Sequence, residues 1–300
     1  MNASMDTRRR ITPGSCAACS GASCDLTSLG QFEDASGKVG RVEVLRCRAC
    51  GHGVTMPPLP DVAFLYAGRE SQDYQPDSHG LSAFIKDLAF RQQGQRLLEQ
   101  LPQTPTSIFD FGCGSGQFTQ VLSSLLPSAD VKGSDFHDLP PSGLGTVDYV
   151  PMDRLSEEAQ RHDLVMAMHV LEHDDDTARL LSQVVALAKP GGTVVIEVPH
   201  IDCVWARILG KKWDAWYVPF HRVHFSRSSL QQVVEASGLE LLSLHDVTVP
   251  TMGRSLANCF GQKNNLFWLL AGIALHPVQW IGEKVSGQPS SIRVIARKAS

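Results

Sequence analysis

The sequence lacks a long hydrophobic run. Its longest uninterrupted apolar stretch, residues 266–275, has ten residues and is followed by His276 and Pro277. A membrane-spanning helix needs about 18 apolar residues. We therefore expect no transmembrane segment, and we expect this stretch to be a core helix, a lid or an interfacial segment.

A secretory leader and an excess of positive charge are also missing. The arginines at residues 8–10 are followed by no apolar stretch, so we expect no signal peptide and a cytoplasmic location. The formal net charge is −4. This charge argues against a protein that coats a polyanion.

No glycine-rich loop of the sequence ends in Gly-Lys-Ser or Gly-Lys-Thr, which excludes a phosphate-binding P-loop. The glycine-rich stretch that is present, SIFDFGCGSGQFT (107–119), instead has an acid before its glycines. Asp110 ends an apolar run, and Gly112, Gly114 and Gly116 precede a helical pattern. This order suits a cofactor with a charged amino-acid end, although a tight structural turn is the alternative.

A second acid follows at the end of the next short apolar segment. Asp135 closes the expected strand 131–135, where an open α/β sheet places a carboxylate that holds the hydroxyls of a ribose. The other expected elements are helices over 81–101, 176–189 and from Ser226 or Ser228 to Gly238, and strands over 147–150, 162–173 and 193–199.

In this order, DFGCGSGQF, GSD, HDLV…VLEH and LAKPGGTVVIEVP resemble the motifs of class I S-adenosylmethionine-dependent methyltransferases over about residues 78–300. The resemblance implies an α/β fold with a doubly wound, mostly parallel, seven-stranded sheet. It also implies S-adenosylmethionine as the cofactor and methyl transfer as the reaction. The cofactor-binding residues expected are Asp110, Gly112, Cys113, Gly114, Gly116, Asp135, Phe136, Met152, Asp153 and His169, with Phe136, Met152 and Asp153 beside the adenine.

Five of the eight cysteines lie in the first 50 residues. Cys16 with Cys19, and Cys47 with Cys50, form two CxxC pairs whose thiolates can complete one tetrahedral Zn²⁺ site. A CxxC can instead be a redox pair, but a redox pair needs no duplicate. We expect a small zinc ribbon with a structural role, in which Cys24 is either a replacement for Cys19 or a packed side chain.

The ribbon, a proline-rich linker and a tyrosine-bearing segment before the core resemble bacterial small-molecule methyltransferases of sugar and natural-product pathways. We expect a zinc-ribbon-like domain at 1–60, a linker or flap at 61–77 and a methyltransferase domain at 78–300. That domain would contain a substrate insertion at 200–226 and an apolar helical segment at 254–285. Tyr66 and Tyr74 either close over the cofactor or pack in the core.

The insertion 200–226 is rich in aromatic residues and histidines. We expect the stretch 213–217 to enclose the acceptor, with a satellite hydrophobic cluster as the alternative. His221 and His224 are the first candidates for a general base because PFHRVHF resembles a region that follows the fifth strand in the family. His173 and then His169 are the next candidates. A metal held by His221 and His224 would lack an acidic partner.

Two other function classes compete with small-molecule methylation. The first is an RNA base methyltransferase with a four-cysteine finger, and the second is a non-catalytic scaffold that keeps the fold. Few aromatic residues lie among the arginines of the N-terminal region, so we expect no nucleic-acid partner. The acceptor, its accepting atom (oxygen, nitrogen or carbon) and the oligomeric state stay open.

Overall fold

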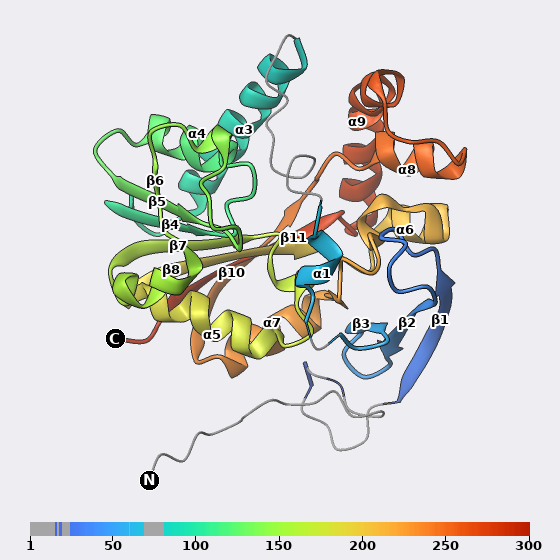
Figure 1. Cartoon of the computed structure of the whole chain (residues 1–300), viewed down its shortest axis with the longest axis horizontal. Coiled ribbons are helices and arrows are strands. Elements are labelled where there is room, and N and C mark those ends of the chain that lie inside the picture. Colours follow the sequence, from blue (N-terminus) through green and yellow to red (C-terminus); the bar gives the residue numbers. More distant parts are fainter. Residues whose placement is uncertain (1–15, 17, 20–24, 60, 69–80) are drawn as a thin grey trace.

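A seven-stranded sheet forms the centre of the computed structural model, which describes residues 16, 18, 19, 25–59, 61–68 and 81–300 (Figure 1). In spatial order its strands are β10 (Leu239–Val247), β11 (Ser291–Lys298), β8 (Ala188–Pro199), β7 (His162–Met168), β4 (Ser107–Phe111), β5 (Asp130–Ser134) and β6 (Asp148–Tyr149). Strands β4 to β8 pair in parallel, and β11 is antiparallel to both of its neighbours. The predicted fold class is confirmed.

Helices cover both faces of this sheet, which explains why its central strands are buried on both sides and mostly apolar. All five residues of β4 are buried. Ile108 packs in one core cluster and the next residue, Phe109, packs in another on the opposite face. The helices are α3 (Leu81–Gln100) and α4 (Gln117–Leu125) on one face, and α5 (Thr177–Leu187) and α7 (Arg227–Ala236) on the other (Figure 1).

Local signals set most element boundaries. Ser226 caps α7 through a capping box with Ser229, and Gly238 follows the helix at a φ of 80°. The strand expected over 162–173, in contrast, ends at Met168. That boundary was wrong because His169 adopts a left-handed φ of 57° and residues Leu171–His173 form a single 3-10 turn.

A second sheet joins the N-terminal region to the core. Its strands are β1 (Leu26–Phe32), β2 (Val42–Cys47), β3 (Gly53–Met56) and β9 (Val223–His224). The fourth strand comes from the segment 200–226, which was expected to be an insertion around substrate. The expected division between a ribbon domain and a methyltransferase domain therefore needs correction, because β3 and β9 are hydrogen-bonded across it.

The contact between the two sheets is a packed core. Val42 and Val44 share a hydrophobic cluster with Trp213 and Trp216, which are 2% and 8% exposed. The expectation that this aromatic stretch encloses the acceptor is thus wrong for the two tryptophans. Their indoles fill the joint between the N-terminal sheet and the core, as in the satellite-cluster alternative.

The C-terminal part adds a helical hairpin beside α6 (Val204–Leu209). It consists of α8 (Met252–Cys259) and α9 (Leu266–Ser286), which pack against each other (Figure 1). Pro277 lies inside α9, so the helix continues beyond the apolar run 266–275 to Ser286, within the apolar helical segment expected at 254–285. Among the described residues, no helix is long and apolar enough to cross a membrane.

Candidate functional site

The glycine-rich turn after β4 holds a buried carboxylate. Asp110 is 3% exposed, and its Oδ2 accepts a hydrogen bond of 2.6 Å from the Thr119 hydroxyl. Its Oδ1 is buried with no hydrogen-bond partner among the described residues. Burial raises the pKa of Asp110 to about 6, against the opposing effect of Thr119. An unpartnered buried oxygen at this turn fits a ligand that brings a cationic donor.

Two of the glycines are required by space as well as by conformation. Gly112 has a φ of 80°, and a Cβ there would lie 2.4 Å from Cγ2 of Val170. Gly116 has a φ of 78°, and a Cβ there would lie 2.5 Å from the Leu144 backbone nitrogen. At Gly114, by contrast, an added Cβ would meet nothing within 4 Å. The turn is therefore closely packed against the protein at Gly112 and Gly116, and it has free space beside Gly114.

Asp135 faces the same turn from the end of β5. The Gly114 N–H donates to its Oδ2 and the Phe136 N–H donates to its Oδ1, both at 2.9 Å. The two N–H groups fix the carboxylate in place, and each carboxylate oxygen can accept more than one hydrogen bond. The structure thus brings Asp110, Gly114 and Asp135 together, as the order of strand-end acids predicted.

The other residues expected around the cofactor surround this centre. Phe136 is exposed, and Met152 lies beside β5, where its Sδ accepts a hydrogen bond of 3.4 Å from the Ser134 hydroxyl. Cys113 is buried, with its side chain against the Cα of Gly133, and burial raises the pKa of its thiol. Asp153 is exposed at the start of the turn that follows β6.

His169 lies between two buried glutamates. Its Nδ1 is 3.3 Å from Glu172 Oε1 and its Nε2 is 3.1 Å from Glu197 Oε1. Burial lowers the pKa of His169, but the two carboxylates outweigh it and raise this pKa to about 10. Arg293 pairs with the other oxygen of Glu197 at 2.6 Å. Both ring nitrogens of His169 face carboxylates and its pKa is raised, which disfavours His169 as a general base.

His221 and His173 face each other beside Glu172. Their rings are 4.8 Å apart, and the ligand atoms of these three residues lie within 4.8 Å of one another. His221 Nδ1 is 2.9 Å from the Ala215 carbonyl, which can only accept, so Nδ1 carries the proton and Nε2 is basic. Burial, then His173 and His224, lower the pKa of His221 well below its usual range, so it is neutral at pH 7.

Glu172 is a functional candidate that the sequence motifs did not single out, although it lies in the VLEH motif beside His173. It is 1% exposed, and its Oε2 has no hydrogen-bond partner among the described residues. Its position directly before His173, a candidate base, was the sequence feature that could have identified it. The structure therefore places an acidic side chain, Glu172, beside His221 and His173. His224 is not part of this group.

His224 lies elsewhere. It is in β9, with its Nε2 3.0 Å from the Thr55 hydroxyl and its ring 5.2 Å from that of Trp216. Burial, then His52 and Arg222, lower its pKa to about 3. His224 thus packs between the N-terminal sheet and the core, which argues against its expected role as a base.

Tyr66, from α1 (Ala63–Tyr66), connects the two groups of residues. Its ring is 5.1 Å from that of Phe136 and 5.3 Å from that of Phe220, and its hydroxyl is 2.8 Å from His173 Nδ1. Tyr217 stacks on Phe220 at 4.6 Å. An aromatic wall therefore runs from the neighbour of Asp135 to the two histidines. Tyr74 lies outside the described residues.

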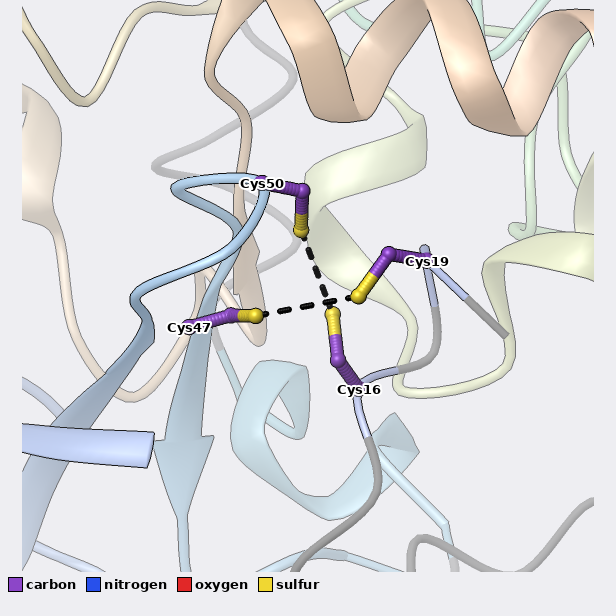
Figure 2. Close-up of side chains that lie close together, drawn as sticks. All are labelled: Cys16, Cys19, Cys47 and Cys50. Atoms are coloured by element: carbon purple, nitrogen blue, oxygen red, sulfur yellow. Dashed lines mark hydrogen bonds between the residues drawn. The ribbon is translucent and has the colours of Figure 1, made fainter. Parts of the chain in front are cut away.

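The four cysteines of the two CxxC pairs converge, as their spacing predicted (Figure 2). The sulfurs of Cys16 and Cys50 are 3.5 Å apart and those of Cys19 and Cys47 are 3.7 Å apart. A tetrahedral zinc with bonds of about 2.3 Å needs sulfurs roughly 3.8 Å apart. These residues could thus hold one metal ion with little movement. Cys24 lies outside the described residues.

Comparison with known proteins identifies a methyltransferase domain in the part of the chain that contains the glycine-rich turn. A family model described as a methyltransferase domain matches residues 83–244. The ubiquinone biosynthesis O-methyltransferase of Methylobacterium sp. (strain 4-46) is 32% identical over 123 residues, which cover 37% of this chain and 47% of that protein. The trans-aconitate 2-methyltransferase of Streptomyces avermitilis is 32% identical over 115 residues, which cover 33% and 41%.

The chain spans about half the length of the curated relatives it matches. Among solved structures, the 1,6-didemethyltoxoflavin-N1-methyltransferase of Burkholderia thailandensis with bound S-adenosylhomocysteine aligns with a TM-score of 0.49 at 17% identity. That alignment covers 90% of this chain and 98% of the other.

The pairing of His169 with two glutamates gives a testable pH dependence. Because its folded pKa is raised, His169 contributes stability that is full below about pH 6.5 and is lost as the pH rises through about 10. In NMR titrations of the imidazole rings we expect His169 to titrate near pH 10, and Glu197→Gln to lower this pKa. Titration of His169 near pH 6.5 in the unmodified protein would contradict the assignment.

Proposed function

Because the chain belongs to the methyltransferase-domain family, we propose that it transfers a methyl group from S-adenosylmethionine to a small-molecule acceptor. The observation that carries the proposal is the position of Tyr66. It lies between Phe136, which follows the carboxylate of Asp135, and the pair His173 and His221. A cofactor held at Asp135 would therefore lie next to a group that can accept a proton.

The residues around the glycine-rich turn fit the cofactor. Asp110 has a buried, unpartnered oxygen for the ammonium of its amino-acid end, and the turn is open at Gly114. Asp135 would accept hydrogen bonds from the ribose hydroxyls, with Phe136 and Met152 beside the adenine. When bound, S-adenosylmethionine supplies an electrophilic methyl group.

His221 is the proposed general base. Its Nδ1 proton is held by the Ala215 carbonyl, so Nε2 can accept a proton from the acceptor. Because the resting ring is neutral, it needs no prior deprotonation at pH 7. Glu172 lies close enough to stabilise the cation that forms, and Tyr66 and the Phe220 carbonyl hold His173 in its orientation.

Aromatic side chains around the two histidines favour a planar or apolar acceptor. The half-buried Tyr66 and Tyr217 would form this wall, with the fully buried Phe220 packed against both, in place of the tryptophans at 213 and 216. The names of two relatives include a ubiquinone-pathway O-methyltransferase and a trans-aconitate methyltransferase. We propose an acceptor in which a hydroxyl or carboxylate group is attached to a planar or apolar molecule.

For the four-cysteine cluster we propose one zinc ion with a structural role. Cys47 ends β2 and Cys50 lies just before β3, so the ion would fix the hairpin that carries β3 to β9. All four ligands would be thiolates, and such closed sites leave no coordination position for chemistry.

Little supports RNA as the substrate. Arg46 pairs with Asp202 at 2.6 Å and Arg48 pairs with Asp25 at 3.2 Å, so two arginines near the cysteines are engaged within the chain. The arginines at residues 8–10 lie outside the described residues. A small-molecule acceptor therefore remains the proposal. Measuring the affinity for S-adenosylmethionine distinguishes this enzyme from a non-catalytic scaffold, which would not need to bind the cofactor.

Replacing Asp135 by Ala should weaken S-adenosylmethionine binding by about 1–3 kcal/mol, because ribose hydroxyls would lose their buried acceptor. Isothermal titration calorimetry measures this change. Asp138→Ala, an exposed carboxylate three positions further on, is the matched control and should bind normally. Unchanged affinity in the Asp135 variant would refute the ribose assignment, and no binding by the unmodified chain would refute the function.

The base can be tested by release of S-adenosylhomocysteine with a panel of catechols, phenols and trans-aconitate. We expect His221→Gln to lose about 10²–10⁴-fold in kcat with any panel member that turns over, and to keep its cofactor affinity. His245→Gln, a half-buried histidine in β10, serves as the control. A normal rate for His221→Gln between pH 6 and 9 would leave His173 as the candidate base, and a normal rate for His173→Gln as well would leave alignment alone as the source of catalysis.

Elemental analysis of the purified chain should find one zinc per molecule. Cys47→Ser should lose the metal and lower the Tm, because the hairpin that carries β3 loses its anchor. Cys259→Ser, a change at an exposed free cysteine, should alter neither quantity. A metal-free chain with an unchanged Tm would overturn the zinc proposal.

A further inference from the structure

Most apolar side chains of helix α9 are exposed, whereas two of its polar side chains are buried against the protein. Gln279 and Glu283 are 0% and 2% exposed, whereas Phe267 and Val285 are 67% and 84% exposed. A surface helix normally has the opposite arrangement, with its apolar stripe against the core. This reversal calls for an apolar environment outside the helix.

The inward polar contacts fix the helix in this orientation. Gln279 Nε2 donates to the Val249 carbonyl at 2.7 Å, and the Thr251 N–H donates to Gln279 Oε1 at 3.3 Å. The Ser290 hydroxyl donates to Glu283 Oε2 at 3.2 Å. Rotating α9 to bury its apolar side would break these bonds and leave buried polar groups unpaired.

The outward side chains form one continuous stripe. Leu266, Leu270, Ile273, Pro277 and Ile281 follow at intervals of three or four residues, which places them on one side of the helix. The four aliphatic members are between 40% and 68% exposed. We call this stripe, with the flanking Phe267 and Val285, the α9 face. Contiguous apolar surface of this kind marks an interaction site.

The charges around the α9 face are of one sign. Residues 251–286 contain three cations, Arg254, Lys263 and Lys284, all exposed, and one acid, the buried Glu283. Arg254 is paired with Asp214, so Lys263 and Lys284 are the cations that flank the two ends of α9. The chain as a whole has a net charge of −4. The hairpin is thus positive within an acidic protein.

We propose that the α9 face binds the surface of a membrane that contains anionic lipids. The apolar stripe would enter the headgroup region with the helix axis in the membrane plane, and Lys263 and Lys284 would meet lipid phosphates. A second copy of the chain fits the α9 face less well. In a symmetric dimer through this face, the exposed lysines of the two hairpins would face each other, and the hairpin has no exposed acid to pair with them. This proposal does not rest on the proposed function.

Flotation of the full chain with extruded vesicles tests the proposal. We expect binding to vesicles of equimolar phosphatidylcholine and phosphatidylglycerol, weaker binding to phosphatidylcholine alone, and a loss of binding as salt is raised. The double variant Leu270→Gln/Ile281→Gln should bind at least about tenfold more weakly, since two exposed aliphatic side chains can no longer be buried. The matched control is Phe84→Gln/Leu139→Gln, a change at two exposed apolar residues of other elements.

Each outcome decides the proposal. Binding that is reduced in the α9 variant and kept in the control supports it, provided that both variants keep the Tm of the unmodified chain. Absence of binding to both kinds of vesicle overturns it, and so does equal binding by the α9 variant and the control. Sedimentation velocity without lipid tests whether a second copy of the chain, and not a membrane, covers the α9 face. A dimer that Leu270→Gln/Ile281→Gln converts to a monomer would show self-association in place of lipid binding.

Discussion

The buried guanidinium of Arg222 is the interaction on which the joint between the two sheets depends. Arg222 is 0% exposed and donates from Nη2 to the carbonyls of Thr55, at 2.9 Å, and Pro57, at 2.6 Å. Its Nε pairs with Asp175 at 3.1 Å. Removing one partner of a buried ion pair costs about 3–5 kcal/mol, because the remaining charge stays in a poorly solvating environment. The N-terminal hairpin and the turn before α5 are therefore held around one side chain.

This joint determines where the proposed base lies. His221 directly precedes Arg222, whose own N–H donates to the Glu172 carbonyl at 2.6 Å. One residue further on, β9 begins and pairs with β3. A zinc ion at the four cysteines, as proposed above, would fix the hairpin from which β3 emerges and would thereby help to position His221. A small cysteine site beside a methyltransferase fold then has a physical purpose, although it lies apart from the cofactor turn.

The sequence predicted what depends on neighbouring residues. Strand β4 and its glycine turn, the cap at Ser226 and the two CxxC pairs each have a pattern that their own segment determines. The roles of His221 and His224 could not be separated in this way. They are three residues apart in similar surroundings, and only the burial of Arg222 and the pairing of β9 with β3 turn one toward His173 and the other toward Thr55.

The same limit applies to two apolar segments, the aromatic stretch at 213–216 and the run that forms the first half of α9. The aromatic stretch at 213–216 was expected to face an acceptor, yet the N-terminal strand β2 covers it through Val42 and Val44. The apolar run at 266–275 was open to a core position, yet no described residue covers its outer side. A sequence shows how apolar a segment is, whereas long-range packing decides what covers it. Because Gln279 and Glu283 are hydrogen-bonded on the inner side of α9, a rotation of the helix that buries its outer side would break these bonds.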